Sequence, residues 1–232
     1  MSYLNSVNPA NKVDLESARA HIEQNILPLL PPDRQTKIVE LGCGTGRYVH
    51  VLHTLGYKNT FGCDSDADSV RFGMESLGLS NSVVCKDLMA YVADSSPDFS
   101  DVVLLIDVIE HLSQETAMDL LRSLKSKLVN SGGVIIIQTP NAFSVFQPTY
   151  WGDCTHKHLY SRHSLQQLVV LCGFDQAEFK EIPIRIHGPV SLIRFLIWKL
   201  ILHPAVLAFH YIAYGNNHGG IYSSNLLCKC GK

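Results

Sequence analysis

Residues 37–48 hold the feature that most constrains the fold, a short apolar run that leads directly into a turn with three glycines. The run, Lys-Ile-Val-Glu-Leu, is typical of a buried parallel strand. Gly42, Gly44 and Gly46 follow it. Glycine adopts positive φ angles readily and, because it lacks a Cβ, lets the backbone pass close to a ligand. The pattern therefore predicts a strand at 37–41 that ends in a ligand-binding turn.

The spacing and charge of this turn narrow the kind of ligand. The glycines follow a G-x-G-x-G pattern, and Arg47 stands where a dinucleotide-binding fingerprint would have its third glycine. Glu40 adds negative charge at the end of the strand. A carboxylate there repels a pyrophosphate and favours a ligand with hydroxyl groups and a cationic centre. These residues therefore disfavour a nicotinamide-dependent oxidoreductase.

A second strand and a second acid follow the glycine turn. Residues 48–55 carry apolar side chains at helical spacing, and Gly56 stands where a helix commonly ends. The next strand-like run, 59–63, leads into Asp64. This order predicts a β-α-β unit with a carboxylate at the tip of its second strand, where a ribose diol is commonly bound. A role for Asp64 as a loop or helix-capping acid is the alternative.

The remaining chain continues to alternate between strand-like and helix-like segments. Strand-like runs and apolar residues at helical spacing take turns up to the C-terminus, which indicates a doubly wound α/β fold with ligands at the carboxyl ends of its strands. A Gly-rich stop at 130–133 is expected to end the helix that begins near residue 113. The further expected strands are 82–86, 101–106, 134–137, 174–182 and 222–230, and the further helices are an N-terminal one ending near 30, 66–77, 113–128 and 165–172.

Three motifs together resemble those of the class I S-adenosylmethionine-dependent methyltransferases. They are Val-Glu-Leu-Gly-Cys-Gly-Thr-Gly at 39–46, Gly-Cys-Asp-Ser-Asp at 62–66 and Ile-Asp-Val-Ile-Glu-His-Leu at 106–112. The third motif is similar to that of the branch with ubiquinone-type O-methyltransferases and many bacterial glycan or small-molecule O-methyltransferases. The resemblance extends over about 36–174. It implies a Rossmann-like, mostly parallel seven-stranded sheet whose last strand is antiparallel.

Length and composition fit one domain. With 232 residues, 46% of them hydrophobic, the chain can bury a complete core. We expect a single methyltransferase domain over 1–232. It would comprise an N-terminal helical cap at 1–32, a cofactor-binding core at 33–182, an apolar helical insertion at 183–221 and a last strand at 222–232.

The resemblance also implies S-adenosyl-L-methionine as cofactor and a set of residues that hold it. Asp64 would bind the ribose diol, Asp87 would accept a hydrogen bond from the adenine amino group, and Asp107 would face the methionine end. A plain loop acid is the alternative for Asp87. The full expected set is Glu40, Gly42, Cys43, Gly44, Gly46, Asp64, Ser65, Lys86, Asp87, Leu88, Asp107 and His111.

The acceptor side is expected in the long loop at 140–160, since long loops in compact domains are commonly lids or binding elements. An imidazole titrates near neutral pH and can take the proton of a hydroxyl group. We expect His156 to act as general base, with His158 as the second candidate and Asp153 to orient the ring. Either histidine could instead only hold the loop through hydrogen bonds. The expected acceptor-binding residues are Tyr150, Trp151 and Tyr160.

The string Asp107-x-x-Glu110-His111 offers a second interpretation. Some ubiquinone-type relatives bind a divalent ion through a similar set of two acids and a histidine, and helical spacing would place these three side chains together. Many relatives with the string look metal-free. We therefore assign no metal.

The segment at 190–214 is unusually apolar. Arg194, Lys199, His203 and Pro204 are expected to divide it into two helices of about ten residues, each too short to cross a bilayer. One interpretation is an amphipathic helix at a membrane surface, which would suit a lipid-linked acceptor. The other is a helical pair that covers the cleft or forms a homodimer contact.

Charge and cysteine usage limit the partners. The net charge is −2 and no run of Lys or Arg occurs, which excludes a basic nucleic-acid-binding surface. Seven cysteines without framework spacing, and an N-terminus without a signal pattern, favour the cytoplasm. We therefore expect a cytoplasmic S-adenosylmethionine-dependent O-methyltransferase for a small-molecule, glycan or lipid-linked acceptor. The alternatives are a non-catalytic cofactor-binding module and N-methylation of a small amine.

Overall fold

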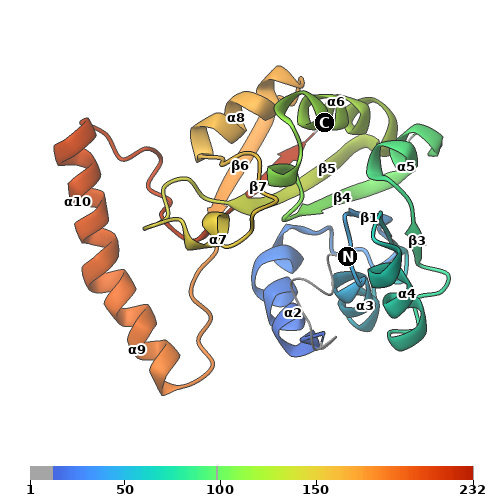
Figure 1. The fold of residues 1–232 in the computed structure, drawn as a ribbon, viewed down its shortest axis with the longest axis horizontal. Coiled ribbons are helices and arrows are strands. Elements are labelled where there is room, and N and C mark those ends of the chain that lie inside the picture. Colours follow the sequence, from blue (N-terminus) through green and yellow to red (C-terminus); the bar gives the residue numbers. More distant parts are fainter. Residues whose placement is uncertain (1–12, 98, 232) are drawn as a thin grey trace.

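A computed structural model describes residues 13–97 and 99–231. Its centre is a seven-stranded sheet with the order β3-β2-β1-β4-β5-β7-β6 (Figure 1). Strand β7 is antiparallel to both of its neighbours, and the other pairs are parallel. This confirms the expected fold class, including the antiparallel last strand. The strands are β1 Ile38–Leu41, β2 Thr60–Asp64, β3 Val83–Cys85, β4 Ser100–Ile106, β5 Val129–Pro140, β6 Gln176–Glu181 and β7 Asn225–Gly231.

Helices cover both faces of the sheet, as Figure 1 shows. Several begin at polar capping side chains: Asp87 caps α5, Ser113 caps α6 and Ser161 caps α8. The N-terminal helical segment ends before Pro31, as expected. The helical elements up to β6 are α2 Leu15–His21, η1 Ile22–Ile26, η2 Leu27–Leu29, α3 Arg47–Thr54, α4 Ala67–Ser76, α5 Leu88–Asp94, η3 Ile109–His111, α6 Gln114–Ser123, η4 Leu124–Leu128, α7 Pro148–Trp151 and α8 Arg162–Leu171.

The core lies on both faces of the central strands, which explains why β4 is apolar along almost its whole length. Val103 and Leu105 pack with α6 and α8 on one face, while Val102 and Leu104 pack with α2 and α3 on the other. All four are fully buried. Alternate residues of a strand point to opposite faces, so a strand covered on both sides needs apolar residues throughout. Because both faces of these strands are packed, residues at their carboxyl ends are held in fixed positions.

Strand β5 begins earlier than the sequence indicates. The expected helix stop at 130–133 lies inside β5, because the strand resumes pairing with β4 after a bulge. The register shifts between Ser100 and Val102, which pair with Val129 and Val134, and Gly132 has a φ of +86°. Glycines that look like a helix stop therefore serve here as the bulge of a strand.

The apolar segment forms one helix, so the expected division into two short helices is wrong. Elements α9 Pro189–Ile197, η5 Trp198–Leu202 and α10 His203–Tyr214 follow each other without a break over 26 residues. Pro204 has no N–H and normally interrupts an α-helix. Here a π-type turn precedes it, in which the N–H of His203 bonds to the carbonyl of Trp198. Figure 1 shows this helix beside the sheet and its covering helices, not packed among them.

Candidate active site

The glycine turn after β1 and the end of β2 face each other at the edge of the sheet. The N–H of Gly44 donates to Oδ2 of Asp64 over 2.7 Å, and the N–H of Asp66 donates to Oδ1 over 2.8 Å. Gly46 then starts α3 with a left-handed φ of +72°. The structure thus brings two parts of the expected cofactor site together, the glycine turn and the acid at the tip of β2.

Buried polar groups lie beneath this turn. Glu40 is 2% exposed, and its Oε2 has no hydrogen-bond partner among the described residues. Burial raises the pKa of Glu40 to about 8, and the charge of Asp64 adds to this effect. Burial also raises the pKa of the Cys43 thiol, so Cys43 is a packed thiol and not a nucleophile.

Four other residues of the expected cofactor set have structural partners of their own. Oδ1 of Asp87 accepts from the N–H groups of residues 89 and 90, which makes Asp87 the N-cap of α5. Lys86 pairs with the exposed Asp94 over 2.6 Å. The carbonyl of Ser65 accepts from the Cys85 thiol over 3.8 Å. Leu88 packs at the edge of the core in the first turn of α5. These bonds fit the alternative interpretation of Asp87 as a loop acid, because the side chain caps a helix.

Asp107 follows β4 in a left-handed conformation with φ +55°, which Asp tolerates better than most side chains. The amide of Gln138 donates to both of its carboxylate oxygens, over 3.0 and 3.1 Å. Asn225 donates to Oδ1 over 3.3 Å. Burial raises the pKa of Asp107, and the hydrogen bond from Gln138 counteracts this. Three neighbouring strands, β4, β5 and β7, therefore hold this carboxyl group at the sheet edge.

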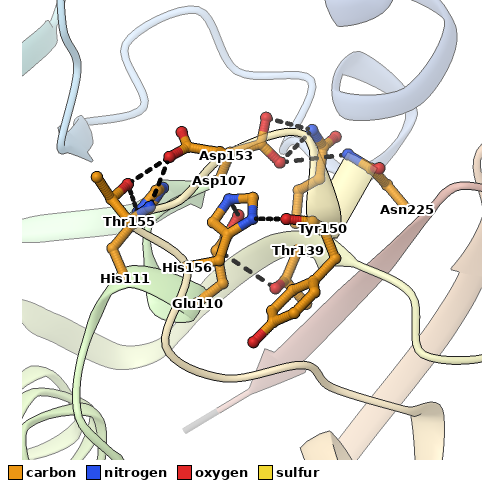
Figure 2. Close-up of polar contacts among 10 residues, drawn as sticks. Asp107, Glu110, His111, Thr139, Tyr150, Asp153, Thr155, His156 and Asn225 are labelled. Atoms are coloured by element: carbon orange, nitrogen blue, oxygen red, sulfur yellow. Dashed lines mark hydrogen bonds and ion pairs between the residues drawn. The ribbon is translucent and has the colours of Figure 1, made fainter. Parts of the chain in front are cut away.

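His156 and Glu110 lie close together in the region where the acceptor is expected (Figure 2). His156 Nδ1 lies 2.7 Å from the carbonyl oxygen of Tyr150, and its Nε2 lies 3.9 Å from Oε1 of Glu110. A carbonyl oxygen can only accept a hydrogen bond, so Nδ1 carries the proton and Nε2 of the neutral ring is the proton acceptor. The ring of Tyr150 stacks on that of His156 with centroids 5.3 Å apart.

Glu110 is fully buried beneath His156. Its Oε2 accepts from the hydroxyl of Thr139 over 3.1 Å, while Oε1 has no hydrogen-bond partner among the described residues. Burial raises the pKa of Glu110 to about 8, and the nearby charge of Asp107 contributes. A buried carboxyl group with a pKa in this range is protonated near neutral pH, and a cation beside it lowers this pKa and favours its ionised form.

Asp153 reaches a different histidine from the one expected. Its Oδ1 accepts from the N–H of Thr155 over 2.8 Å and from the Thr155 hydroxyl over 2.6 Å. Because that hydroxyl donates to Asp153, it accepts from His111 Nδ1, which lies 2.9 Å away. In Figure 2 these three residues form a chain beside His156. Asp153 therefore orients His111 through Thr155, and the carboxyl group beside the ring of His156 is Glu110.

The other residues of the loop divide into structural and exposed ones. Nε2 of His158 accepts from the N–H of Gln114 at the start of α6 over 3.1 Å, so this histidine holds the loop against that helix. Tyr160 is 6% exposed, its carbonyl accepts from the N–H of Ala142 over 2.8 Å, and it forms an isolated parallel bridge with Asn141. Trp151 is 72% exposed. Of the expected acceptor residues, Tyr150 is the one whose ring stacks on His156 among the residues that the structure describes.

A candidate cation site exists in this region, with a different composition from the one that the sequence suggests. One ligand atom each of Glu110, His111 and His156 lie within 4.8 Å of one another. Asp107 is not part of this group; its carboxylate is bound by Gln138 and Asn225. His156 takes its place because the loop 140–160 folds back over the end of β4.

A cavity of about 370 Å³ adjoins Asp107 on the side of β7. Gln138 and Asn225, which bind Asp107, form part of its wall. Trp198 of the apolar helix forms another part. The cavity thus connects the polar ends of the strands with an aromatic side chain of η5.

Several residues of this arrangement have no signal in the sequence. Gln138, Thr139 and Asn225 are polar residues at strand ends with no distinctive spacing. Thr155 lies within the expected loop but looks like a turn residue. Glu110 stands out only as part of the metal-like string.

Comparison with known families decides the identity. The model of the methyltransferase domain family matches residues 15–178, which is most of the chain. This chain belongs to the methyltransferase domain family. None of the curated proteins matches it. The expectation of an enzyme of this superfamily is confirmed.

Solved structures share this fold at low sequence identity. A SAM-dependent methyltransferase from Archaeoglobus fulgidus is 18% identical with a TM-score of 0.72, covering 99% of this chain and 100% of that one. An S-adenosylmethionine-dependent methyltransferase from Mesorhizobium loti is 16% identical with a TM-score of 0.62, covering 94% and 100%. The PH0226 protein from Pyrococcus horikoshii is 14% identical with a TM-score of 0.63, covering 100% and 99%.

The methyltransferase fold implies S-adenosylmethionine as the methyl donor, and the residues at the glycine turn fit such a ligand. A Cβ added at Gly42 would meet Val108 at 2.6 Å and one at Gly46 would meet Leu79 at 2.7 Å, so packing requires these glycines. A Cβ at Gly44 would meet nothing within 4 Å. Open space beside Gly44, together with the unpartnered Oε2 of Glu40, is what a cationic ligand close to the backbone needs.

Proposed function

We propose that this methyltransferase methylates a hydroxyl group, with His156 as the general base and Glu110 as its charge partner. Alcohols and phenols need a base because their neutral oxygen is a weak nucleophile, whereas a neutral amine does not. The observation that carries the proposal is the fixed tautomer of His156. The bond from Nδ1 to the Tyr150 carbonyl leaves Nε2 to take the proton.

The donor supplies, when bound, a methyl group that is already activated on a sulfonium. The protein must therefore hold the acceptor, exclude water and remove one proton. Nε2 of His156 would take the hydroxyl proton as the new oxygen–carbon bond forms. The resulting imidazolium would lie 3.9 Å from Oε1 of Glu110. A cation there favours the ionised form of Glu110, which lowers the cost of protonating His156.

The remaining residues would position these two groups. The ring of Tyr150 stacks on His156, and Thr139 fixes the second oxygen of Glu110. The chain from Asp153 through Thr155 orients His111, whose ring lies 4.6 Å from that of His156. Burial lowers the pKa of His111, which keeps it neutral beside a protonated His156. The acceptor class remains a small molecule, a glycan or a lipid-linked molecule.

Replacing His156 by Ala tests this proposal. We expect kcat to fall by roughly 10²–10⁴-fold, because general-base catalysis contributes about that much. S-adenosylhomocysteine binding, measured by calorimetry, should not change. Turnover would be measured as S-adenosylhomocysteine release with a panel of alcohol, phenol, carboxylate and amine acceptors.

His158→Ala is the matched control, since the ring of His158 binds the start of α6. It should lower thermal stability and leave kcat within a few fold. Undiminished turnover by the His156 variant would refute the base. Loss of wild-type activity on dialysis against EDTA, with recovery on adding Mn²⁺, would instead make His156 a metal ligand together with Glu110 and His111.

A further inference from the structure

The helix at 189–214 is apolar on every side and stands largely outside the core. Two charged residues, Arg194 and Lys199, occur in its 26 residues, and its most apolar window is 0% buried. Leu200 is 68% exposed, Ile201 61% and Ile212 86%. A helix that is hydrophobic all round is normally covered by a protein core or by lipid. The described part of the chain supplies no core for it.

The exposed side chains form a continuous apolar face. At about 100° per residue, Ile193, Leu196, Ile197, Leu200 and Ile201 fall within one arc of about 140°, and His203 and His210 lie just beyond one edge of it. Arg194 lies at the other edge, and Lys199 lies farther round the helix, past the two histidines. A wide apolar face on a helix that carries two cations and no acidic residue matches the boundary between the acyl chains and anionic headgroups of a bilayer.

Contacts to the body fix how the helix can lie. The rings of His203 and His210 pack against Tyr222, with centroids 5.4 and 4.9 Å apart, and Phe143 meets His210 at 5.3 Å. Trp198 lines the same cavity as Gln138 and Asn225, the two residues that bind Asp107. At about 1.5 Å per residue the helix is long enough to cross a bilayer. Crossing would separate these contacts, because both neighbouring strands, β6 and β7, belong to the same sheet.

We propose that the helix 189–214 docks this enzyme on the surface of an anionic bilayer, lying in the plane of the membrane. Docking places the cavity behind Trp198 at the lipid surface. Docking also has a consequence for the acceptor, which rests on the proposed function. The hydroxyl acceptor is amphiphilic and reaches the cavity from the membrane. The occupant of the exposed face is lipid, not a second copy of the chain.

Vesicle flotation with the purified full-length protein tests the docking. Wild type should float with vesicles of phosphatidylcholine and phosphatidylglycerol, and should float poorly with phosphatidylcholine alone. Leu200→Glu combined with Ile201→Glu should lower the partition coefficient at least tenfold. Arg194→Gln and Lys199→Gln should each weaken binding about fivefold. Val170→Glu, on the exposed side of α8, is the matched control and should bind like wild type.

Each outcome decides the proposal. A wild-type protein that stays with the soluble fraction, or a double-Glu variant that floats normally, overturns the docking. Resistance of the bound protein to alkaline carbonate extraction overturns the in-plane orientation. A dimer that the double-Glu substitution dissociates, without vesicle binding, overturns the choice of lipid. S-adenosylhomocysteine binding by every variant shows that it is folded, and this readout separates failed docking from failed methyl transfer.

Discussion

Replacing Glu40 by Gln should change how the stability of the ligand-free enzyme depends on pH. Glu40 is 2% exposed on β1, and burial raises its pKa from the ordinary 4.5 to about 8. A carboxyl group with a higher pKa in the folded chain stabilises the fold while it is protonated in both states. As the pH rises above 4.5, the unfolded chain loses this proton first. The free energy of unfolding should therefore fall until the pH reaches about 8.

The size of this effect follows from the two pKa values. Proton linkage between an unfolded value of 4.5 and a folded value of about 8 gives a loss of about 3 kcal/mol from pH 4.5 to pH 7. Glutamine keeps the shape of Glu40 and cannot ionise. Between pH 4.5 and pH 7, the free energy of unfolding of E40Q should thus rise by about 3 kcal/mol relative to that of wild type. The pH dependence that comes from the other groups is the same in both proteins and cancels in this difference.

Urea unfolding followed by circular dichroism at several pH values, without donor, measures this difference. Glu75→Gln is the control, since Glu75 lies exposed on α4. Its difference from wild type should not vary with pH. If the curves of E40Q and wild type run parallel from pH 5 to pH 8, Glu40 is ionised in the folded protein and the argument from burial fails.

Two further predictions concern the donor and the base. Gly44→Leu should weaken S-adenosylhomocysteine binding by more than about 100-fold in calorimetry, because a side chain would fill the open space beside the turn. Gly78→Leu, at a similar positive φ and also facing open space, should strain the backbone and spare binding, and equal losses would refute the role of Gly44. Wild-type kcat should rise with pH up to about 8, since Glu110 ionises over this range and its negative charge stabilises the imidazolium that forms on His156 during methyl transfer. E110Q should not show this rise of kcat with pH, and its kcat should be about tenfold or more below that of wild type. An unchanged pH profile would contradict the pairing of Glu110 with His156.

The cofactor half of the site could be read from local sequence because its chemistry is largely backbone chemistry. Gly42, Gly44 and Gly46 do adopt positive φ angles. Asp64 does bond to the glycine turn. Both follow from a strand–turn–helix–strand order in which short-range residue types set the geometry. Asp87 shows the limit, since the same residue type serves equally as a helix cap.

The proposed acceptor half of the site depends on packing between distant segments. His156 could be recognised as a residue able to accept a proton, yet its partner could not be chosen from the sequence. Asp153 is nearer in the chain, but the loop turns that carboxylate toward Thr155 and brings Glu110 under the ring. Side-chain partners across a long loop depend on how the loop folds over the strand ends, and no periodic pattern records this.

By itself the sequence determined the alternation of strands and helices, the positive-φ glycine turn and the apolar character of 189–214, because each follows from residue type and short-range spacing. Only the tertiary structure decided that this segment is one helix. Pro204 looks like a break, and a π-type turn before it accommodates the missing N–H. Whether the apolar side chains are covered also depends on the rest of the chain, which buries the central strands on both faces and leaves this helix exposed.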